Sequence, residues 1–101
     1  REPEISAIFA TSNLISHGSL RAMSEDGLKI PEDISIISFD DQPYSDLLKT
    51  PMTTVTQQKE EIGRLAFKLL IEQIKTNKIN KTQLVKIPTK LVERKSVRKI
   101  N

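Results

Sequence analysis

Short β-branched runs alternate with helical segments along the 101 residues, and this order most constrains the fold. The apolar run Ile5–Ala10 is expected to be a strand covered on both faces, and Ile34–Phe39 is expected to be a second, β-branched strand. Between them lies a helical segment, which Ser12 or Asn13 can cap at its start and Gly27 can end. Strands that alternate with helices indicate an α/β fold, in which a parallel sheet is the default arrangement.

The second half of the chain continues this alternation. Thr53–Thr56 is β-prone, and Gln57 to about Lys78 is predicted as the strongest helix because its apolar residues recur at i, i+4 and i+7. Leu84–Ile87 and Lys90–Arg94 are expected to be two short closing strands. Asp46–Lys49 is expected to form one helical turn before Pro51.

The composition excludes most chemistries of small enzymes. The chain has no cysteine, one histidine and three glycines, which rules out disulfides, cysteine nucleophiles, multi-histidine zinc sites and glycine-rich phosphate loops. We therefore expect no catalytic site, no metal and no cofactor. No stretch approaches the roughly 20 apolar residues of a membrane span, so we expect no membrane partner. The lack of cysteine fits a reducing, cytoplasmic location.

The net charge of +3 conceals an uneven distribution. Residues 81–101 carry seven Lys or Arg and a single acidic residue, whereas residues 1–80 carry an excess of acids. Such a basic end could contact nucleic acid. No aromatic residue is interleaved for base stacking, so a solvated, frayed end with a basic tail over residues 97–101 is the favoured expectation.

Polar residues follow two of the predicted strands at the points where they end. Ser12 and Asn13 follow the first, and Asp40 and Asp41 follow the second. Ligands of open α/β sheets bind beyond the carboxyl ends of strands, and a carboxylate that accepts hydrogen bonds from hydroxyls suits a sugar. Alternatively, these residues only cap the turn and the helix. A magnesium site is disfavoured because adjacent acids on an extended chain point opposite ways.

Seven segments occur in an order and spacing typical of one family. They are Ala7–Asn13, Gly18–Ala22, Gly27–Ser35, Ser38–Asp41, Pro51–Val55, Glu61–Gly63 and Leu91–Arg94. Together they resemble the C-terminal third of LacI/GalR-family bacterial transcription regulators. Ser38 replaces a glycine that is usual in its block.

The resemblance implies a periplasmic-binding-protein-like parallel-sheet core, of which this chain is the C-terminal fragment only. Residues 1–56 and about 89–96 would belong to the C-subdomain, and about 57–88 to the N-subdomain, with the DNA-binding headpiece absent. The implied function is effector sensing and dimerisation in a sugar-responsive, DNA-binding repressor. The alternative is a fragment of a periplasmic sugar-binding protein with the same fold.

The resemblance also assigns partners and residues. Asp40 matches the family's sugar-contacting aspartate, and Ser12 and Asn13 match its other effector-binding positions. The implied partners are a small-molecule effector (a sugar or sugar phosphate), a second copy in a homodimer, and operator DNA bound only through the missing headpiece. The positions that match the family's dimer contacts are His17, Leu20, Tyr44, Leu47 and Leu48.

Overall fold

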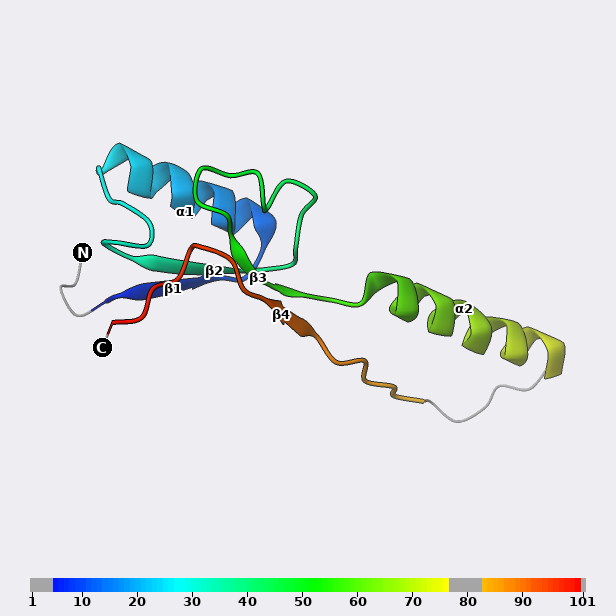
Figure 1. Ribbon diagram of the computed structural model, residues 1–101. Coiled ribbons are helices and arrows are strands. Elements are labelled where there is room, and N and C mark those ends of the chain that lie inside the picture. Colours follow the sequence, from blue (N-terminus) through cyan, green and yellow to red (C-terminus); the bar gives the residue numbers. More distant parts are fainter. Residues whose placement is uncertain (1–4, 77–82, 101) are drawn as a thin grey trace. The chain divides into compact units, whose positions relative to one another are not determined.

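The computed structural model describes residues 5–76 and 83–100, within which four strands and two helices form (Figure 1). The chain divides into two compact units. Unit 1 consists of the described residues of 1–56 and 90–101, and unit 2 consists of those of 57–89. Among the described residues, no helix combines the length and the apolar character needed to cross a bilayer.

Unit 1 is built on a four-stranded sheet in the described part of the chain. Its order is β1 (Ala7–Ala10), β2 (Ser35–Phe39), β3 (Thr53–Thr56) and β4 (Lys90–Val92). The first three strands are parallel, which confirms the predicted α/β fold, but β4 runs antiparallel to β3. β4 begins at Lys90, which pairs with Thr56 at the end of β3, and from there β4 runs back along β3.

Helix α1 (Asn13–Glu25) covers one face of this sheet (Figure 1). The core lies between them, and Ile36 at its centre is completely buried. Burial of this apolar surface is the main stabilising contribution to unit 1. The fully buried apolar side chains of the core are Ala10, Met23, Ile34, Ile36 and Met52, against which Ile8, Leu20, Leu28, Ile30 and Leu48 pack.

Both ends of α1 follow the sequence signals. The Ser12 hydroxyl accepts a hydrogen bond from the Ile15 amide at 3.2 Å, which caps the first turn. Gly27 follows the helix with φ of +71°, and the Leu28 amide donates to the Met23 carbonyl at 2.9 Å. This is a Schellman motif, in which the left-handed residue lets the chain turn back and brings Leu28 onto the core.

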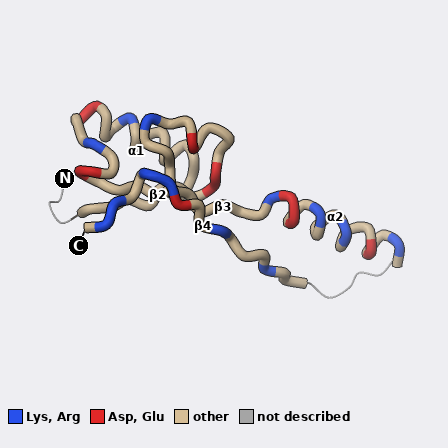
Figure 2. Tube along the Cα trace, viewed as in Figure 1, with Lys and Arg blue, Asp and Glu red and all other residues tan. Residues whose placement is uncertain are grey.

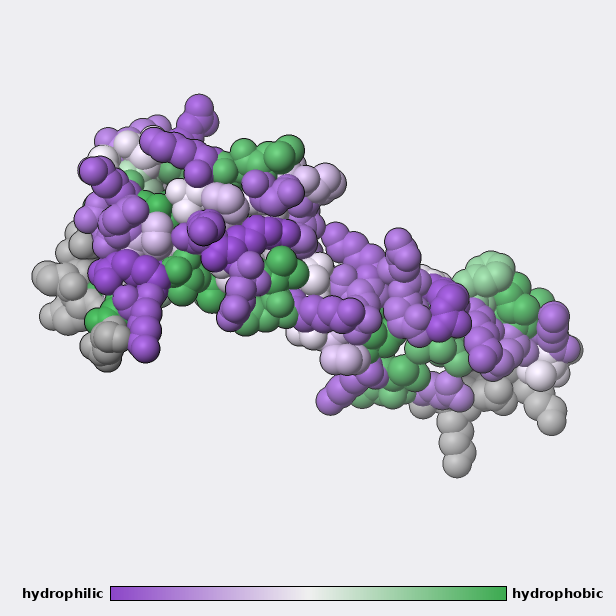
Figure 3. All heavy atoms as spheres, viewed as in Figure 1, coloured by the Kyte–Doolittle hydropathy of each residue, from purple (hydrophilic) through white to green (hydrophobic). Residues whose placement is uncertain are grey.

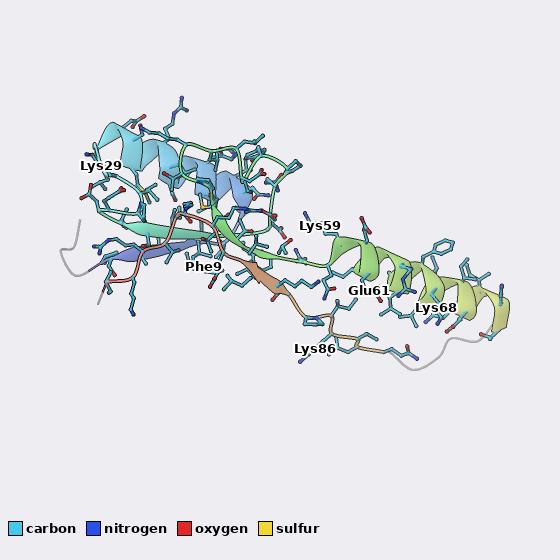
Figure 4. The ribbon with its side chains drawn as sticks, viewed as in Figure 1. Phe9, Lys29, Lys59, Glu61, Lys68 and Lys86 are labelled. Atoms are coloured by element: carbon cyan, nitrogen blue, oxygen red, sulfur yellow. The ribbon has the colours of Figure 1, made fainter. Side chains whose placement is uncertain are left out.

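The opposite face of the sheet is apolar and partly open. Phe9, on this face, is 53% exposed and points away from α1 (Figure 4). Ile37 pairs with it in register, and Val55 and Leu91 continue the same face on β3 and β4. Apolar residues gather on this side of unit 1 (Figure 3). The expectation that the first strand is covered on both faces is therefore not met within the described residues.

The segment between β2 and β3 forms turns and bends. Asp46–Lys49 does not make the predicted helical turn, although the Leu47 amide donates to the Tyr44 carbonyl at 2.9 Å. Four residues cannot repay the cost of nucleating a helix unless further turns follow, and Pro51 prevents them. The Met52 amide instead donates to the Ser45 carbonyl at 2.9 Å, which closes a loop on the core.

The C-terminal end of unit 1 is held in place: the expectation of a frayed, solvated end is wrong for Ser96, and Arg98 is exposed but hydrogen-bonded. Ser96 is completely buried: its hydroxyl donates to the Ile36 carbonyl at 2.6 Å and accepts from the Thr53 amide at 2.8 Å. The Arg98 side chain donates to the Pro31 carbonyl at 3.1 Å. Ser96 can reach Ile36 because β3 begins too late to pair with the first half of β2.

Unit 2 consists of helix α2 (Lys59–Thr76) and the segment after it. Residues 77 and 78, the last of the predicted helix, lie outside the described residues. Basic and acidic residues are interspersed along α2 (Figure 2), and Glu61 pairs with Arg64. The predicted strand Leu84–Ile87 is wrong: this extended segment has no partner strand in the described part of the chain. Its apolar side chains instead line a groove with Ile62, Leu65, Ala66 and Leu69 of α2.

Gly27→Ala should lower the free energy of unfolding of unit 1 by about 1 kcal/mol, because a Cβ is disfavoured at positive φ. Gly18→Ala is the matched control. A Cβ at Gly18 meets no atom within 4 Å, so the same substitution inside α1 should raise stability by up to about 1 kcal/mol. Urea unfolding followed by circular dichroism measures both values. Equal effects at the two positions would contradict the Schellman assignment.

Candidate functional site

The register of β1 and β2 brings the predicted site residues to one edge of unit 1. Ala10 pairs with Ser38 in parallel strands, so Ser12 and Asp40 each follow the last pair by two residues. The two strands therefore end side by side, at the start of α1 (Figure 1). We call Ser12, Asn13, Asp40 and Asp41 the polar edge of the sheet. In open α/β sheets this is the position where ligands bind.

Ser12 and Asn13 are half-buried at this edge. The Ser12 oxygen is engaged in the helix cap, as the capping alternative predicts, and its hydroxyl proton is left to donate. Asn13 lines a small hollow together with His17, Ser38 and Gln42. The contact of either residue with an effector stays a prediction.

Asp40 has an unusual backbone. It is half-buried directly after β2, and its φ is +75°, in the left-handed region. Its amide donates to the Val55 carbonyl of β3 at 2.7 Å. Non-glycine residues with positive φ are uncommon, and outliers of this kind cluster at functional sites. Asparagine and aspartate tolerate this conformation better than other L-residues.

Asp41, the next residue, is held by Arg94. The two guanidinium nitrogens Nη1 and Nη2 donate to Oδ1 and Oδ2 at 2.8 and 2.9 Å, and the Thr54 hydroxyl donates to Oδ1 at 3.1 Å. Hydrogen bonding to Arg94 lowers the pKa of Asp41 from 3.8 to about 2, against the opposing effect of burial. Thr54 and Ser45 add to the lowering.

Arg94 is anchored on three sides. Its Nη1 also donates to the Met52 carbonyl at 2.6 Å, and its amide donates to the Thr53 hydroxyl at 3.0 Å. The sequence did not predict this network: Arg94 was expected at the end of the closing strand Lys90–Arg94 and in a basic end, and Thr53 and Thr54 were expected only in a β-prone segment. No spacing rule links residues 53 positions apart. The signal that was available is an arginine at the end of the predicted closing strand, two residues after β4 as the structure has it.

The network also bears on the magnesium hypothesis. Asp41 is committed to Arg94, so Asp40 and Asp41 do not act together as a pair of metal ligands. Within residues 5–76 and 83–100, no group of three or more His, Cys, Asp or Glu side chains is placed to hold a metal ion.

The five residues matched to dimer contacts fall into two groups. His17 Nε2 and the Tyr44 hydroxyl lie 2.6 Å apart in a hydrogen bond at the surface, and Leu47 is 78% exposed. Leu20 and Leu48, in contrast, pack against the core of unit 1. The first three thus lie at the surface, whereas the last two are part of the packing around the core, and the role of all five in a dimer stays a prediction.

The comparisons with known proteins agree with this fold. The family described as the periplasmic binding protein-like domain matches residues 1–97. The chain therefore belongs to the periplasmic binding protein-like domain family. Within it, the predicted resemblance to LacI-family regulators is confirmed by the relatives that follow.

The HTH-type transcriptional repressor PurR of Actinobacillus pleuropneumoniae serotype 3 is 40% identical over 96 residues, which are 94% of this chain and 29% of that repressor. A LacI family transcriptional regulator from Enterococcus faecalis V583, solved with bound ribose, has a TM-score of 0.81 at 36% identity. The LacI family regulator CCPA from Weissella paramesenteroides, solved with bound sucrose, has a TM-score of 0.79 at 35% identity.

These structural matches cover 93% and 94% of this chain, and 35% and 33% of the two regulators. The chain thus spans about a third of the length of the proteins that it matches.

Asp41→Asn should lower the free energy of unfolding at pH 7 by about 1–2 kcal/mol, because the ionised carboxylate loses its pairing with Arg94. A carboxyl with a lowered pKa stabilises the fold above the unfolded-state pKa of about 3.9. This contribution disappears as the pH falls toward about 2. The difference between the two proteins should therefore shrink from pH 5 to pH 2.

Urea unfolding across this pH range measures the effect. Glu61→Gln is the matched control, since it breaks the exposed Glu61–Arg64 pair in unit 2. Surface pairs contribute little to stability, so this variant should follow the unsubstituted protein. A difference for Asp41→Asn that stays constant down to pH 2 would show that the loss does not come from ionisation.

Proposed function

We propose that this chain is the effector-sensing and dimerisation part of a sugar-responsive, DNA-binding transcriptional repressor. The observation that carries the proposal is the polar edge of unit 1, where the ends of two parallel strands bring Ser12, Asn13 and Asp40 together. Carboxylate, amide and hydroxyl groups are those that bind the hydroxyls of sugars. The matches to regulators solved with ribose and with sucrose support this ligand class.

Asp40 is the residue on which we expect ligand binding to depend most. An ionised carboxylate can accept hydrogen bonds from two neighbouring sugar hydroxyls, and bonds to charged groups are the stronger ones. Ser12 and Asn13 would add a donor and an amide from the adjacent strand end. Sugar phosphate is the second candidate within this ligand class, and a direct comparison of the two ligands decides between them.

The two units fit the subdomain arrangement of this family. We assign unit 1 to the C-subdomain and unit 2 to the N-subdomain, so that the chain crosses between subdomains at Thr56–Gln57 and at Thr89–Lys90. Unit 1 would then supply one wall of the effector site. The other walls would come from parts of the protein outside this chain, which covers about a third of its relatives.

Operator binding is proposed for the full-length protein and not for these residues. In the described part of the chain, α1 and α2 are separated by β2 and β3, so they cannot form a helix-turn-helix pair. Effector binding would act on DNA affinity through a second copy of the protein, because palindromic operators match two-fold symmetric dimers. The periplasmic alternative shares the fold, but the relatives favour a regulator.

Asp40→Asn in the full-length protein should weaken sugar binding about 10- to 100-fold, the equivalent of losing one or two hydrogen bonds to a charged group. Asparagine tolerates positive φ, so the fold should be kept. Isothermal titration calorimetry with ribose, glucose, sucrose, cellobiose and ribose 5-phosphate measures binding. Operator affinity without sugar should be unchanged.

Glu32→Gln is the matched control, since it removes the same charge at the opposite end of β2 and should bind sugar normally. The proposal fails if none of these ligands binds the protein, or if Asp40→Asn binds as tightly as the original.

Leu47→Glu should weaken the homodimer at least tenfold, because it places a charge on a surface leucine that is 78% exposed beside Tyr44. Sedimentation velocity over a concentration series measures the dissociation constant. Lys49→Glu, also on the exposed side of this loop, is the control and should leave dimerisation nearly unchanged. A dimer equally stable in both variants would place the interface elsewhere.

A further inference from the structure

Among the described residues, Asp40 is the one non-glycine residue whose φ is positive. This conformation is unfavourable for an L-residue, so the neighbours of Asp40 have to impose it. In the left-handed region the Cβ of an L-residue approaches the following carbonyl oxygen, so the isolated chain avoids it. The turn after β2 therefore keeps this shape only if the residues on both sides of Asp40 are fixed.

The residues before Asp40 are fixed by the sheet. Phe39 pairs with Val55 in register, and the Asp40 amide donates to the Val55 carbonyl at 2.7 Å. This bond sets the direction in which the chain leaves β2. Strand pairing ends at Phe39, so the ladder of β2 does not extend to the peptide after Asp40.

The residue after Asp40 is fixed by the ion pair. Both carboxylate oxygens of Asp41 are bound by the Arg94 guanidinium, whose planar fork allows a single bidentate orientation. Arg94 is itself tied to the Met52 carbonyl and the Thr53 hydroxyl at the start of β3. Asp41 is thus attached to the same sheet as Asp40 by a second, independent route.

We propose that the Asp41–Arg94 ion pair is a positioning element, which holds Asp40 in its left-handed conformation and so presents the Asp40 carboxylate to the ligand. The inference rests on the proposed function, in which Asp40 binds the sugar. Neither Asp41 nor Arg94 needs to touch the ligand for this role. Both act through the backbone of Asp40, and their loss misdirects a carboxylate that is still present.

The test uses the full-length protein and whichever sugar of the panel binds it most tightly. Asp41→Asn should weaken binding about tenfold, a typical cost of a displaced binding group. Arg94→Lys keeps the positive charge but loses the guanidinium group that binds both oxygens of Asp41, so this variant should also bind the sugar more weakly. Glu61→Gln breaks an ion pair of unit 2 and should have no effect. Circular dichroism confirms that each variant is folded at the temperature used.

The double variant Asp40→Asn/Asp41→Asn separates positioning from simple stability. If Asp41 acts by aiming the Asp40 carboxylate, its substitution should have no further effect once that carboxylate is gone, so the double variant should bind like Asp40→Asn alone. A purely structural role would make the two effects additive. Additive effects, or sugar binding by Asp41→Asn that equals that of the original protein, overturn the inference.

A crystal structure of Asp41→Asn gives a readout that does not depend on the ligand. We expect the φ of Asp40 to leave the left-handed region, and a φ that stays near +75° overturns the inference. If Asp40→Asn leaves sugar binding intact, the proposed ligand role of Asp40 is wrong. The φ of Asp40 in this crystal structure then still decides whether the ion pair holds the backbone.

Discussion

Strand β2 is hydrogen-bonded along both of its edges, and the rest of unit 1 depends on this pairing. One edge is occupied by β1, and the second half of the other edge by β3. Where β3 has not yet begun, Ser96 takes its place and bonds both the amide and the carbonyl of Ile36. Because an unpaired backbone group in this core would be costly, the C-terminal segment is as necessary to the sheet as a strand.

Much of unit 1 could be predicted from local patterns. The β-branched runs, the Ser12 cap and the left-handed glycine after α1 each depend on neighbouring residues, and the polar edge follows from where two strands end. The misses depend on distant partners. Leu84–Ile87 has the apolar, β-branched composition of a strand but no partner in the described residues, and propensity alone does not make a sheet. Asp41 and Arg94 meet only because β4 returns beside β3, which no spacing reveals.

Both units keep apolar surface in contact with solvent. In unit 1 this is the sheet face that carries Phe9 and Leu91, and in unit 2 it includes Phe67 and Ile74 on α2. Contiguous apolar surfaces of this kind usually mark positions where other elements pack. They agree with the finding that the chain spans about a third of the length of its relatives.

The lowered pKa of Asp41 makes its ion pair with Arg94, at the polar edge, insensitive to pH. With a pKa of about 2, this carboxylate keeps its charge at any acidity in which a folded protein of this kind operates. The ion pair with Arg94 therefore stays formed as the pH falls or rises in this range. It does not act as a pH sensor. The turn after β2 would therefore keep one shape across this range of pH, whatever else in the molecule titrates.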